Sequence, residues 1–337
     1  MTPLRAALLG LDGVGLVYLD ALRSCTLFDL VAIADTSAER IRKIEHPPGV
    51  TTFDDCRSLV AAQTRDPIDA LVVALPPHQS IELLPLAAER GVPVFHHTPF
   101  ARTTAECQMV AQLFSTARGT FEAARLWSAL LPDVTRPDLL RRAGRVVAAH
   151  ACVQHTQTVT NWRGDPQRAG GGALLYAGYG AVDALVALLG LPESVCAECA
   201  WAAAPGAPRG YDTEDVAIVT LRFGHGEIGS LTVWRGADTN QWALTLIGTD
   251  ATVSVGRPSA REDAGADELA ARELEIASSV QAGLEAMGRR LQDRTATRAA
   301  SSAEAHVATL ATIEAAYLSS KTGSAEVPAQ FIQEPPG

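Results

Sequence analysis

Residues 1–124 alternate short apolar runs with segments of helical spacing, and this pattern limits the fold more than any other feature of the chain. Five apolar runs are predicted as strands: Leu4–Gly10, Leu30–Ala34, Ala70–Leu75, Val92–Phe95 and Gly119–Ala124. Helical spacing occurs between them, at Gly13–Ser24, Ser37–Lys43, Ser80–Arg90 and Thr104–Ala117. Continuous apolar strands separated by helices are typical of a parallel sheet covered on both faces. The pattern therefore predicts a doubly wound α/β domain over residues 1–124.

The pattern changes in residues 125–330, where most strands follow one another without helices between them. Arg145–Thr160 has β-type composition, and Gly171–Leu189 has helical spacing behind three glycines. Alternating runs follow at Val195–Ala203, Val216–Phe223, Gly226–Trp234, Trp242–Ile247 and Ala251–Val255. Helices are expected at Glu268–Leu291 and Ser302–Ser319, with a polar loop at Ser259–Asp267. We predict an α+β domain with an open-faced mixed β-sheet over 125–330, and a flexible tail over 331–337.

Charge and hydropathy disfavour several classes of protein. The chain has 337 residues and a formal net charge of −10, and a surface of that sign repels nucleic-acid phosphates and anionic lipid. No run of about 18 apolar residues occurs, so no membrane span is expected. The first ten residues lead directly into a strand and lack the layout of a secretory signal. The sequence predicts a cytoplasmic protein with no nucleic-acid or membrane partner.

Cysteine spacing was the remaining feature that could indicate a metal site. Cys196 and Cys199 have the spacing of half a zinc site. No second cysteine pair or nearby histidine pair completes it, and residues three apart on a strand point to opposite faces. We therefore predict no metal site.

The first strand ends in Gly10-Leu11-Asp12-Gly13-Val14-Gly15, which matches most of the dinucleotide-binding fingerprint. Gly10 and Gly15 stand where that fingerprint needs a tight turn and close helix packing. Asp12 replaces the middle glycine, and its carboxylate would meet the pyrophosphate with bulk and like charge. Asp35 ends the second strand, where an acidic side chain binds the ribose hydroxyls of NAD and repels the extra phosphate of NADP. The sequence predicts a Rossmann-type domain that either prefers NAD or, because of Asp12, has lost cofactor binding.

Landmarks along the whole chain form one pattern. They are the Gly10–Gly15 turn, Ala34-Asp35, Val72–Pro77, Trp162-Arg163 with Gly170–Leu174, Leu246–Thr249 and Ser319-Ser320. Together they resemble the Gfo/Idh/MocA family, the group of glucose-fructose oxidoreductase and inositol dehydrogenase. The resemblance implies a nicotinamide cofactor, a sugar-like or cyclic alcohol substrate, and homodimers or homotetramers formed through the open sheet. The cofactor contacts it implies are Gly10, Asp12, Gly13, Gly15, Asp35, Pro76 and Thr98.

The chain departs from this family at the positions that move a proton. The family reads Glu-Lys-Pro after the fifth strand, and its lysine holds the reacting hydroxyl, whereas this chain reads His97-Thr98-Pro99. Behind the three glycines the family has an aspartate and then a histidine as general base, at positions occupied here by Tyr176 and Gly180. Alcohol oxidation needs a group with a pKa near neutrality to take the hydroxyl proton. Thr98 and Gly180 cannot do this, so the usual proton machinery is absent.

The replacements include polar groups, and four residues are candidate site residues: Tyr176, His97, Tyr179 and Arg163. A tyrosine can act as an acid or base if its pKa is lowered, and a histidine titrates near neutrality. Arg163 could hold a carboxylate or phosphate with two hydrogen bonds. Tyr179 is equally consistent with core packing. His96 and His97 alternate on a strand, so at most one of them faces a ligand.

Three functions are consistent with these residues. The first is a small-molecule enzyme with an altered active site that acts on a sugar-like or cyclic metabolite by elimination, isomerisation or cyclisation. The second is an NAD-dependent oxidoreductase whose general base has moved to Tyr176 or His97. The third is a binding or regulatory protein, as in the family's galactose-pathway repressor. The sequence favours the first, because polar and titratable groups accompany the lost ones, although the fold alone does not decide function.

Overall fold

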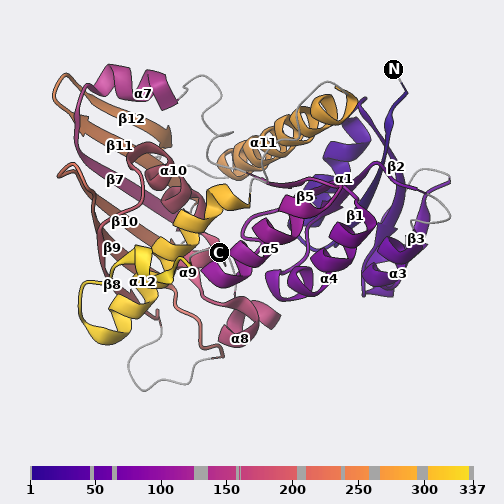
Figure 1. Ribbon diagram of the computed structural model, residues 1–337, viewed down its shortest axis with the longest axis horizontal. Coiled ribbons are helices and arrows are strands. Elements are labelled where there is room, and N and C mark those ends of the chain that lie inside the picture. The colour runs from indigo at the N-terminus through magenta and orange to yellow at the C-terminus, as the bar shows by residue number, and fades with distance from the viewer. Residues whose placement is uncertain are drawn as a thin grey trace. The chain divides into compact units, whose positions relative to one another are not determined.

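The computed structural model divides into two compact units, and each is described by itself (Figure 1). The structure describes residues 2–45, 49–62, 67–124, 136–156, 159, 161–202, 210–236, 240–257, 266–293 and 303–333. Unit 1 comprises Met1–Ala101, Glu106–Ala129 and Glu273–Glu304, and unit 2 comprises Arg102–Ala105, Leu130–Arg272 and Ala305–Gly337.

Unit 1 contains a six-stranded sheet in the order β3-β2-β1-β4-β5-β6, in which all neighbouring strands are parallel. The strands are β1 (Leu4–Leu9), β2 (Phe28–Ala34), β3 (Thr51–Phe53), β4 (Ala70–Val73), β5 (Val94–His96) and β6 (Phe121–Ala123). The helices between them are α1 (Val14–Ser24), α2 (Ala38–Lys43), α3 (Cys56–Ala61), α4 (Pro77–Arg90) and α5 (Thr104–Thr116). The predicted doubly wound parallel sheet is confirmed. Strand β3 was not predicted, because its short edge segment is largely exposed and carries no apolar run.

The core of unit 1 also includes helix α11 (Ala266–Gln292). Three of its apolar side chains share one buried cluster with Leu8 and Tyr18: Val280, Leu284 and Met287. Gly283 allows close packing, since a Cβ there would lie 2.8 Å from Phe95 Cζ. The predicted boundary at residues 124/125 put this helix in the second domain, whereas the contacts place Glu273–Glu304 in unit 1. Helical periodicity identifies an apolar face but not the core that buries it.

Unit 2 contains a six-stranded mixed sheet in the order β12-β11-β7-β10-β9-β8. Its strands are β7 (Val146–His155), β8 (Ser194–Ala200), β9 (Val216–Arg222), β10 (Ile228–Arg235), β11 (Gln241–Gly248) and β12 (Thr252–Arg257). Strands β7 and β10 pair in parallel, and every other neighbouring pair is antiparallel. The predicted mixed sheet is confirmed.

Helices α10 (Tyr179–Leu189) and α12 (Val307–Thr322) pack against this sheet. Shorter elements complete unit 2: α7 (Arg136–Ala143), η2 (Asn161–Gly164), α8 (Pro166–Ala169), α9 (Ala173–Tyr176), η3 (Glu304–His306) and η4 (Pro328–Phe331). The single helix predicted at Gly171–Leu189 is instead two helices, α9 and α10, with a break before Tyr179. Residues 334–337 of the predicted tail and 258–265 of the predicted loop lie outside the described residues.

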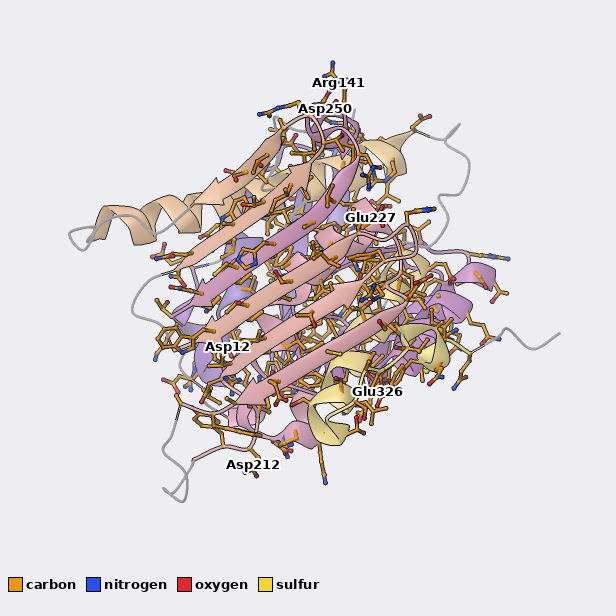
Figure 2. All side chains as sticks on the ribbon, turned by 90° about the vertical axis from the view of Figure 1, so that its left-hand side faces the viewer. Asp12, Arg141, Asp212, Glu227, Asp250 and Glu326 are labelled. Atoms are coloured by element: carbon orange, nitrogen blue, oxygen red, sulfur yellow. The ribbon has the colours of Figure 1, made fainter. Side chains whose placement is uncertain are left out.

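One face of the mixed sheet is turned toward the viewer in Figure 2, with no described helix over it. Apolar side chains on this face are 41–54% exposed: Ile218, Ile228, Trp234 and Ile247. The edge strand β8 is covered by α12, whose Ser319 and Ser320 hydroxyls accept hydrogen bonds from the backbone of β8. The donors are Ala197 N and Cys199 N. The sheet therefore has a protected edge and an open apolar face.

We also looked for a membrane-spanning helix among the described residues. No single helix there has the length and hydropathy required. One bent pair, Pro166–Tyr176 with Tyr179–Leu189 at 60°, reaches that length and composition together.

Candidate functional site

The turn between β1 and α1 has the backbone shape that a dinucleotide requires. Gly10 has φ +90°, and a Cβ there would lie 2.8 Å from Ala74 O. A Cβ at Gly15 would lie 2.2 Å from Gly10 O, so strand and helix meet without room for a side chain. Gly13 stands at the N-cap of α1, and Asp12 is exposed in the same turn. The turn therefore fits a pyrophosphate by its backbone, while Asp12 adds a negative charge there.

The other predicted cofactor residues follow β2, β4 and β5. Because these strands are parallel, Asp35, Pro76 and Thr98 lie at the same edge of the sheet as the glycine turn. Pro76 is the N-cap of α4. Thr98 is 7% exposed and its hydroxyl donates to Ala124 O at 3.0 Å. The structure thus brings all predicted cofactor residues to one edge of unit 1.

Asp35 is 2% exposed and its carboxylate is fully engaged. It accepts hydrogen bonds from Leu11 N at 2.8 Å and Ser37 N at 2.7 Å. Arg40 Nη1 contacts both carboxylate oxygens, at 3.0 and 2.9 Å. The sequence analysis missed Arg40, although its place on the helix directly after Asp35 was a usable signal. In this structure the charge of Asp35 is compensated by a cation and two N–H groups.

His97 follows β5 and is half-buried. Its Nδ1 lies 3.3 Å from the hydroxyl of Tyr18 on α1, and the two rings meet edge to face. Tyr18 is fully buried, and burial raises its pKa well above the ordinary value, so the phenol keeps its proton. Nothing in the sequence predicted this pair, because its members are 79 residues apart.

His96 precedes His97 and has the opposite environment. It is fully buried between Phe100 and Phe121, and its Nδ1 contacts His97 O. Burial lowers the pKa of His96 to about 4, so it is neutral at pH 7. Only His97 of the two is accessible, as the alternation of a strand predicts.

Unit 2 brings Trp162, Arg163 and Tyr176 together. The guanidinium carbon of Arg163 lies 4.5 Å from the centre of the Trp162 ring, within range of a cation–π interaction. The Trp162 and Tyr176 rings meet edge to face at 5.4 Å. The Tyr176 hydroxyl donates to Ala169 O at 2.6 Å. This hydroxyl oxygen can still accept a hydrogen bond, but its proton is already engaged.

The remaining candidates on α10 lie differently. Tyr179 is 3% exposed, with its hydroxyl 3.0 Å from His306 Nδ1. Asp183 is buried beside them and accepts from Thr309 Oγ1 at 3.1 Å. Gly180 is half-buried and brings no side chain. These positions favour a packing role for Tyr179.

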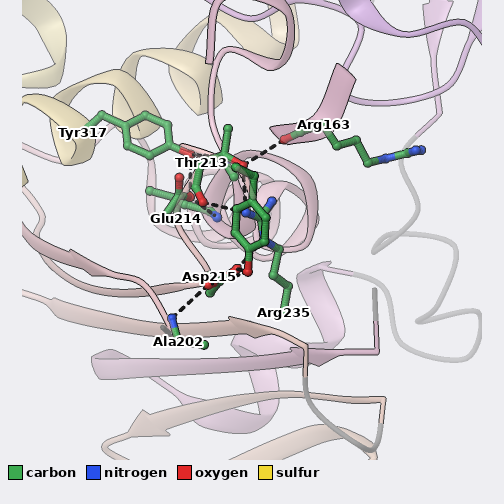
Figure 3. A network of polar contacts seen from close by, with 10 residues as sticks. Arg163, Ala202, Thr213, Glu214, Asp215, Arg235 and Tyr317 are labelled. Carbon is green, nitrogen blue, oxygen red and sulfur yellow. Dashed lines mark hydrogen bonds and ion pairs between the residues drawn. The ribbon is translucent and has the colours of Figure 1, made fainter. Parts of the chain in front are cut away.

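Gly171 and Gly172 pack against the phenol of Tyr317 and the buried Glu214, which Figure 3 shows in one polar network. Tyr317 of α12 donates to Glu214 Oε1 at 2.9 Å, and its oxygen accepts from Gly172 N at 3.1 Å. A Cβ at Gly171 would lie 2.2 Å from the Tyr317 hydroxyl, and one at Gly172 would lie 2.2 Å from Glu214 O. Burial raises the pKa of Glu214 and that of Tyr317. The glycines are therefore required by packing.

A buried ion pair adjoins this group. Arg235 and Asp215 are each 2% exposed, with Arg235 Nε 3.0 Å from Asp215 Oδ1. Arg235 Nη2 also donates to Thr213 O, and Tyr211 donates to Asp215. The side chain of Arg163 extends away from this network in Figure 3, while its carbonyl accepts from Thr213 Oγ1. The sequence did not predict this network, whose members come from β10 and from the segment that precedes β9.

In the described part of the chain, no group of three or more histidine, cysteine, aspartate or glutamate residues is arranged to hold a metal ion.

Comparison with known proteins assigns both parts of the chain. Residues 4–123 match the model of the oxidoreductase family with an NAD-binding Rossmann fold, and residues 141–254 match the GFO/IDH/MocA C-terminal domain. A search of the curated proteins found no significant match.

Solved structures share the fold at low identity. GenD2 from gentamicin A biosynthesis, in complex with NAD, is 19% identical over 97% of each chain, with a TM-score of 0.81. The WlbA dehydrogenase from Bordetella pertussis, in complex with NADH and UDP-GlcNAcA, is 22% identical over 96% of this chain and 97% of its own, with a TM-score of 0.75. The myo-inositol 2-dehydrogenase from Lactobacillus plantarum is 16% identical over 96% and 99%, with a TM-score of 0.76. With both domain models matched in order, the chain belongs to the Gfo/Idh/MocA oxidoreductase family.

Proposed function

We propose that this chain is a nicotinamide-binding enzyme that acts on a sugar-like or cyclic small molecule through an active site altered from that of its family. The family assignment and the glycine turn support the cofactor. The contact between Tyr18 and His97 carries the proposal that the chemistry is altered.

The Tyr18 contact determines which nitrogen of His97 holds the proton. Among the described residues, His97 Nδ1 is the only hydrogen-bond partner of the Tyr18 hydroxyl. A buried hydroxyl proton without an acceptor costs about 1–3 kcal/mol. Tyr18 therefore donates to Nδ1, and the neutral ring carries its own proton on Nε2. His97 is then a hydrogen-bond donor beyond the end of β5.

A donor at this place suits some reactions and not others. It can hold and polarise a carbonyl or hydroxyl oxygen, which replaces part of what the family's lysine does at position 98. It cannot take a proton from an alcohol without leaving the Tyr18 hydroxyl unpaired. We therefore favour elimination, isomerisation or cyclisation next to a carbonyl over oxidation of an alcohol.

In unit 2, we propose that Arg163 binds an anionic group of the substrate. Its guanidinium stacks on Trp162, which orients the planar fork that suits a carboxylate or phosphate. Tyr176 supports Trp162, and its hydroxyl oxygen can accept from a substrate hydroxyl.

The rival function is nicotinamide-dependent oxidation with a relocated base. His97 favours it, because an imidazole nitrogen can accept a proton from a substrate hydroxyl. In that case turnover changes the absorbance of added nicotinamide cofactor, and His97→Gln abolishes turnover. In the function we favour, product forms while the ratio of oxidised to reduced cofactor stays at its starting value.

The test begins with thermal unfolding of the full chain with each nicotinamide nucleotide, followed by ¹⁵N NMR of His97 at pH 8. A nucleotide at about 100 times its Kd should add roughly 2.7 kcal/mol of stability. The NMR spectrum should show the Nε2–H tautomer in the wild type and a mixture of tautomers in Tyr18→Phe. No nucleotide shift would overturn this function and leave a binding or regulatory role. The Nδ1–H tautomer in the wild type would also overturn it, but in favour of oxidation with Nε2 of His97 as the base.

We also propose that two copies of the chain associate through the open sheet face. This face carries exposed apolar side chains and is not covered by a described helix, and a large apolar patch marks an interaction surface. Light scattering should report a dimer or tetramer for the wild type and a monomer for Trp234→Glu. Leu318→Glu, an equally exposed position on α12, should leave the mass unchanged.

A further inference from the structure

The end of β2 is where the adenosine ribose lies in a dinucleotide-binding domain, so its side chains decide between NAD and NADP. Asp35 alone would exclude NADP by repelling the 2′-phosphate. In this structure, however, Asp35 is buried and its oxygens are held by Leu11 N, Ser37 N and Arg40. Its negative charge is already paired with the positive charge of Arg40, whose Nη1 lies 2.9 Å from Asp35 Oδ2.

Arg40 keeps unused donors in this arrangement. Its side chain is 43% exposed, and a single nitrogen, Nη1, makes both contacts with Asp35. Among the described residues, Nη2 and Nε of Arg40 have no hydrogen-bond acceptor. A guanidinium presents its donors in a rigid fork that matches a phosphate.

The surrounding groups add donors. Thr36 is exposed and Ser37 is half-buried. The Ser37 oxygen accepts from Arg40 N, which leaves its own proton to donate. The nearby carboxylate of Glu39 is paired with Lys43 at 2.6 Å. Both nearby carboxylates are therefore paired with cations, and the unused donors of Arg40 and Ser37 are available to an additional anion.

We propose that this site accepts a 2′-phosphate, so that NADP(H) binds at least as tightly as NAD(H), with Arg40 as the specificity-determining residue. The proposal rests on the nicotinamide binding proposed above. It reverses the preference that Asp35 predicts when it is considered without Arg40. The residues of the glycine turn are not involved, so the proposal can be tested independently of Asp12.

Two adenosine nucleotides isolate the 2′-phosphate from the rest of the cofactor. Adenosine 2′,5′-bisphosphate and adenosine 5′-monophosphate differ only in that group, and isothermal titration of the full chain measures the Kd of each. We expect the bisphosphate to bind about tenfold tighter, the effect of one charge-assisted contact. Arg40→Gln should remove that difference, and Arg40→Lys should retain part of it.

Arg42→Gln is the matched control, because it removes the same charge from the same helix. Arg42 donates only to Ala38 O among the described residues and does not contact Asp35. The bisphosphate should keep its advantage in this variant. An equal loss in Arg42→Gln would show that net charge, and not Arg40, is responsible, and would overturn the proposal.

The remaining outcomes separate this proposal from the proposed function. Binding of NAD and the monophosphate, with no advantage for the bisphosphate, would overturn the specificity and leave the nicotinamide function standing. Absence of binding by NAD, NADP, the monophosphate and the bisphosphate would overturn both. Circular dichroism of each variant confirms that Arg40, a half-exposed side chain, can be replaced without unfolding.

Discussion

The strand ends of unit 1 and the three-glycine segment of unit 2 both carry family landmarks, but the structure uses these landmarks differently. In unit 1, Gly10 and Gly15 shape a turn whose backbone can accept a ligand. In unit 2, Gly171 and Gly172 make room for Tyr317 and Glu214 of the protein itself. One set of glycines fits a cofactor, and the other fits the protein's own core.

This difference separates glycines that shape a ligand-binding turn from glycines that serve packing. Gly171 and Gly172 pack against the polar network of Tyr317 and Glu214, which gives them a structural role whatever the reaction. The hydroxyls of Thr98 and Tyr176 donate to carbonyl groups outside that network, and Gly180 has no side chain. Retained glycines in unit 2 therefore say little about catalysis.

The first and largest predicted effect is on the free energy of unfolding, and it concerns the buried Arg235–Asp215 ion pair of unit 2. Arg235→Met should lower the free energy of unfolding by about 3–5 kcal/mol, because it leaves the Asp215 carboxylate buried without its cation. Urea denaturation measures this. Arg168→Met is the control, since the Arg168–Asp165 pair is exposed and such pairs contribute about 0–1 kcal/mol. Equal effects of the two variants would contradict the comparison.

The second prediction concerns unit 1 and depends on pH. Burial lowers the pKa of His96 from 6.5 to about 4, so between these values the unfolded chain binds a proton that the folded chain does not. Stability should therefore fall as pH falls through this range, by roughly 3 kcal/mol from this residue.

Urea denaturation between pH 7 and pH 4 checks this prediction. His96→Leu should flatten the decline by that amount, because leucine does not titrate. His225→Gln, at an exposed position, should keep the wild-type slope. An unchanged slope in His96→Leu would show that other groups cause the acid sensitivity.

The third and smallest predicted effect concerns the packing of Gly172 in unit 2. Gly172→Ala should cost about 1–3 kcal/mol, the usual cost of overpacking, since its Cβ would clash with Glu214 O. Gly210→Ala is the control, because a Cβ there meets nothing within 4 Å. Thermal unfolding without ligand measures both, and a tolerated Gly172→Ala would mean that packing does not explain this glycine.

Local patterns were sufficient for much of the architecture. The apolar runs predicted the central parallel strands of unit 1 and the consecutive strands of unit 2, because strand burial follows sequence periodicity. They did not predict β3, which is short and exposed, or the break between α9 and α10. Helical spacing continues through that break, so periodicity alone could not reveal it.

The sequence by itself determined the family and the two folds, and it predicted that Thr98 and Gly180 stand where the resemblance implies a lysine and a histidine. Only the tertiary structure decided what the remaining groups do. It paired Tyr18 with His97 and α11 with the core of unit 1. Hydrogen bonds and ion pairs depend on distances in space, and residues far apart in sequence give no local signal of their approach. The character of each polar group, whether it is engaged or available, therefore became visible only once the chain was folded.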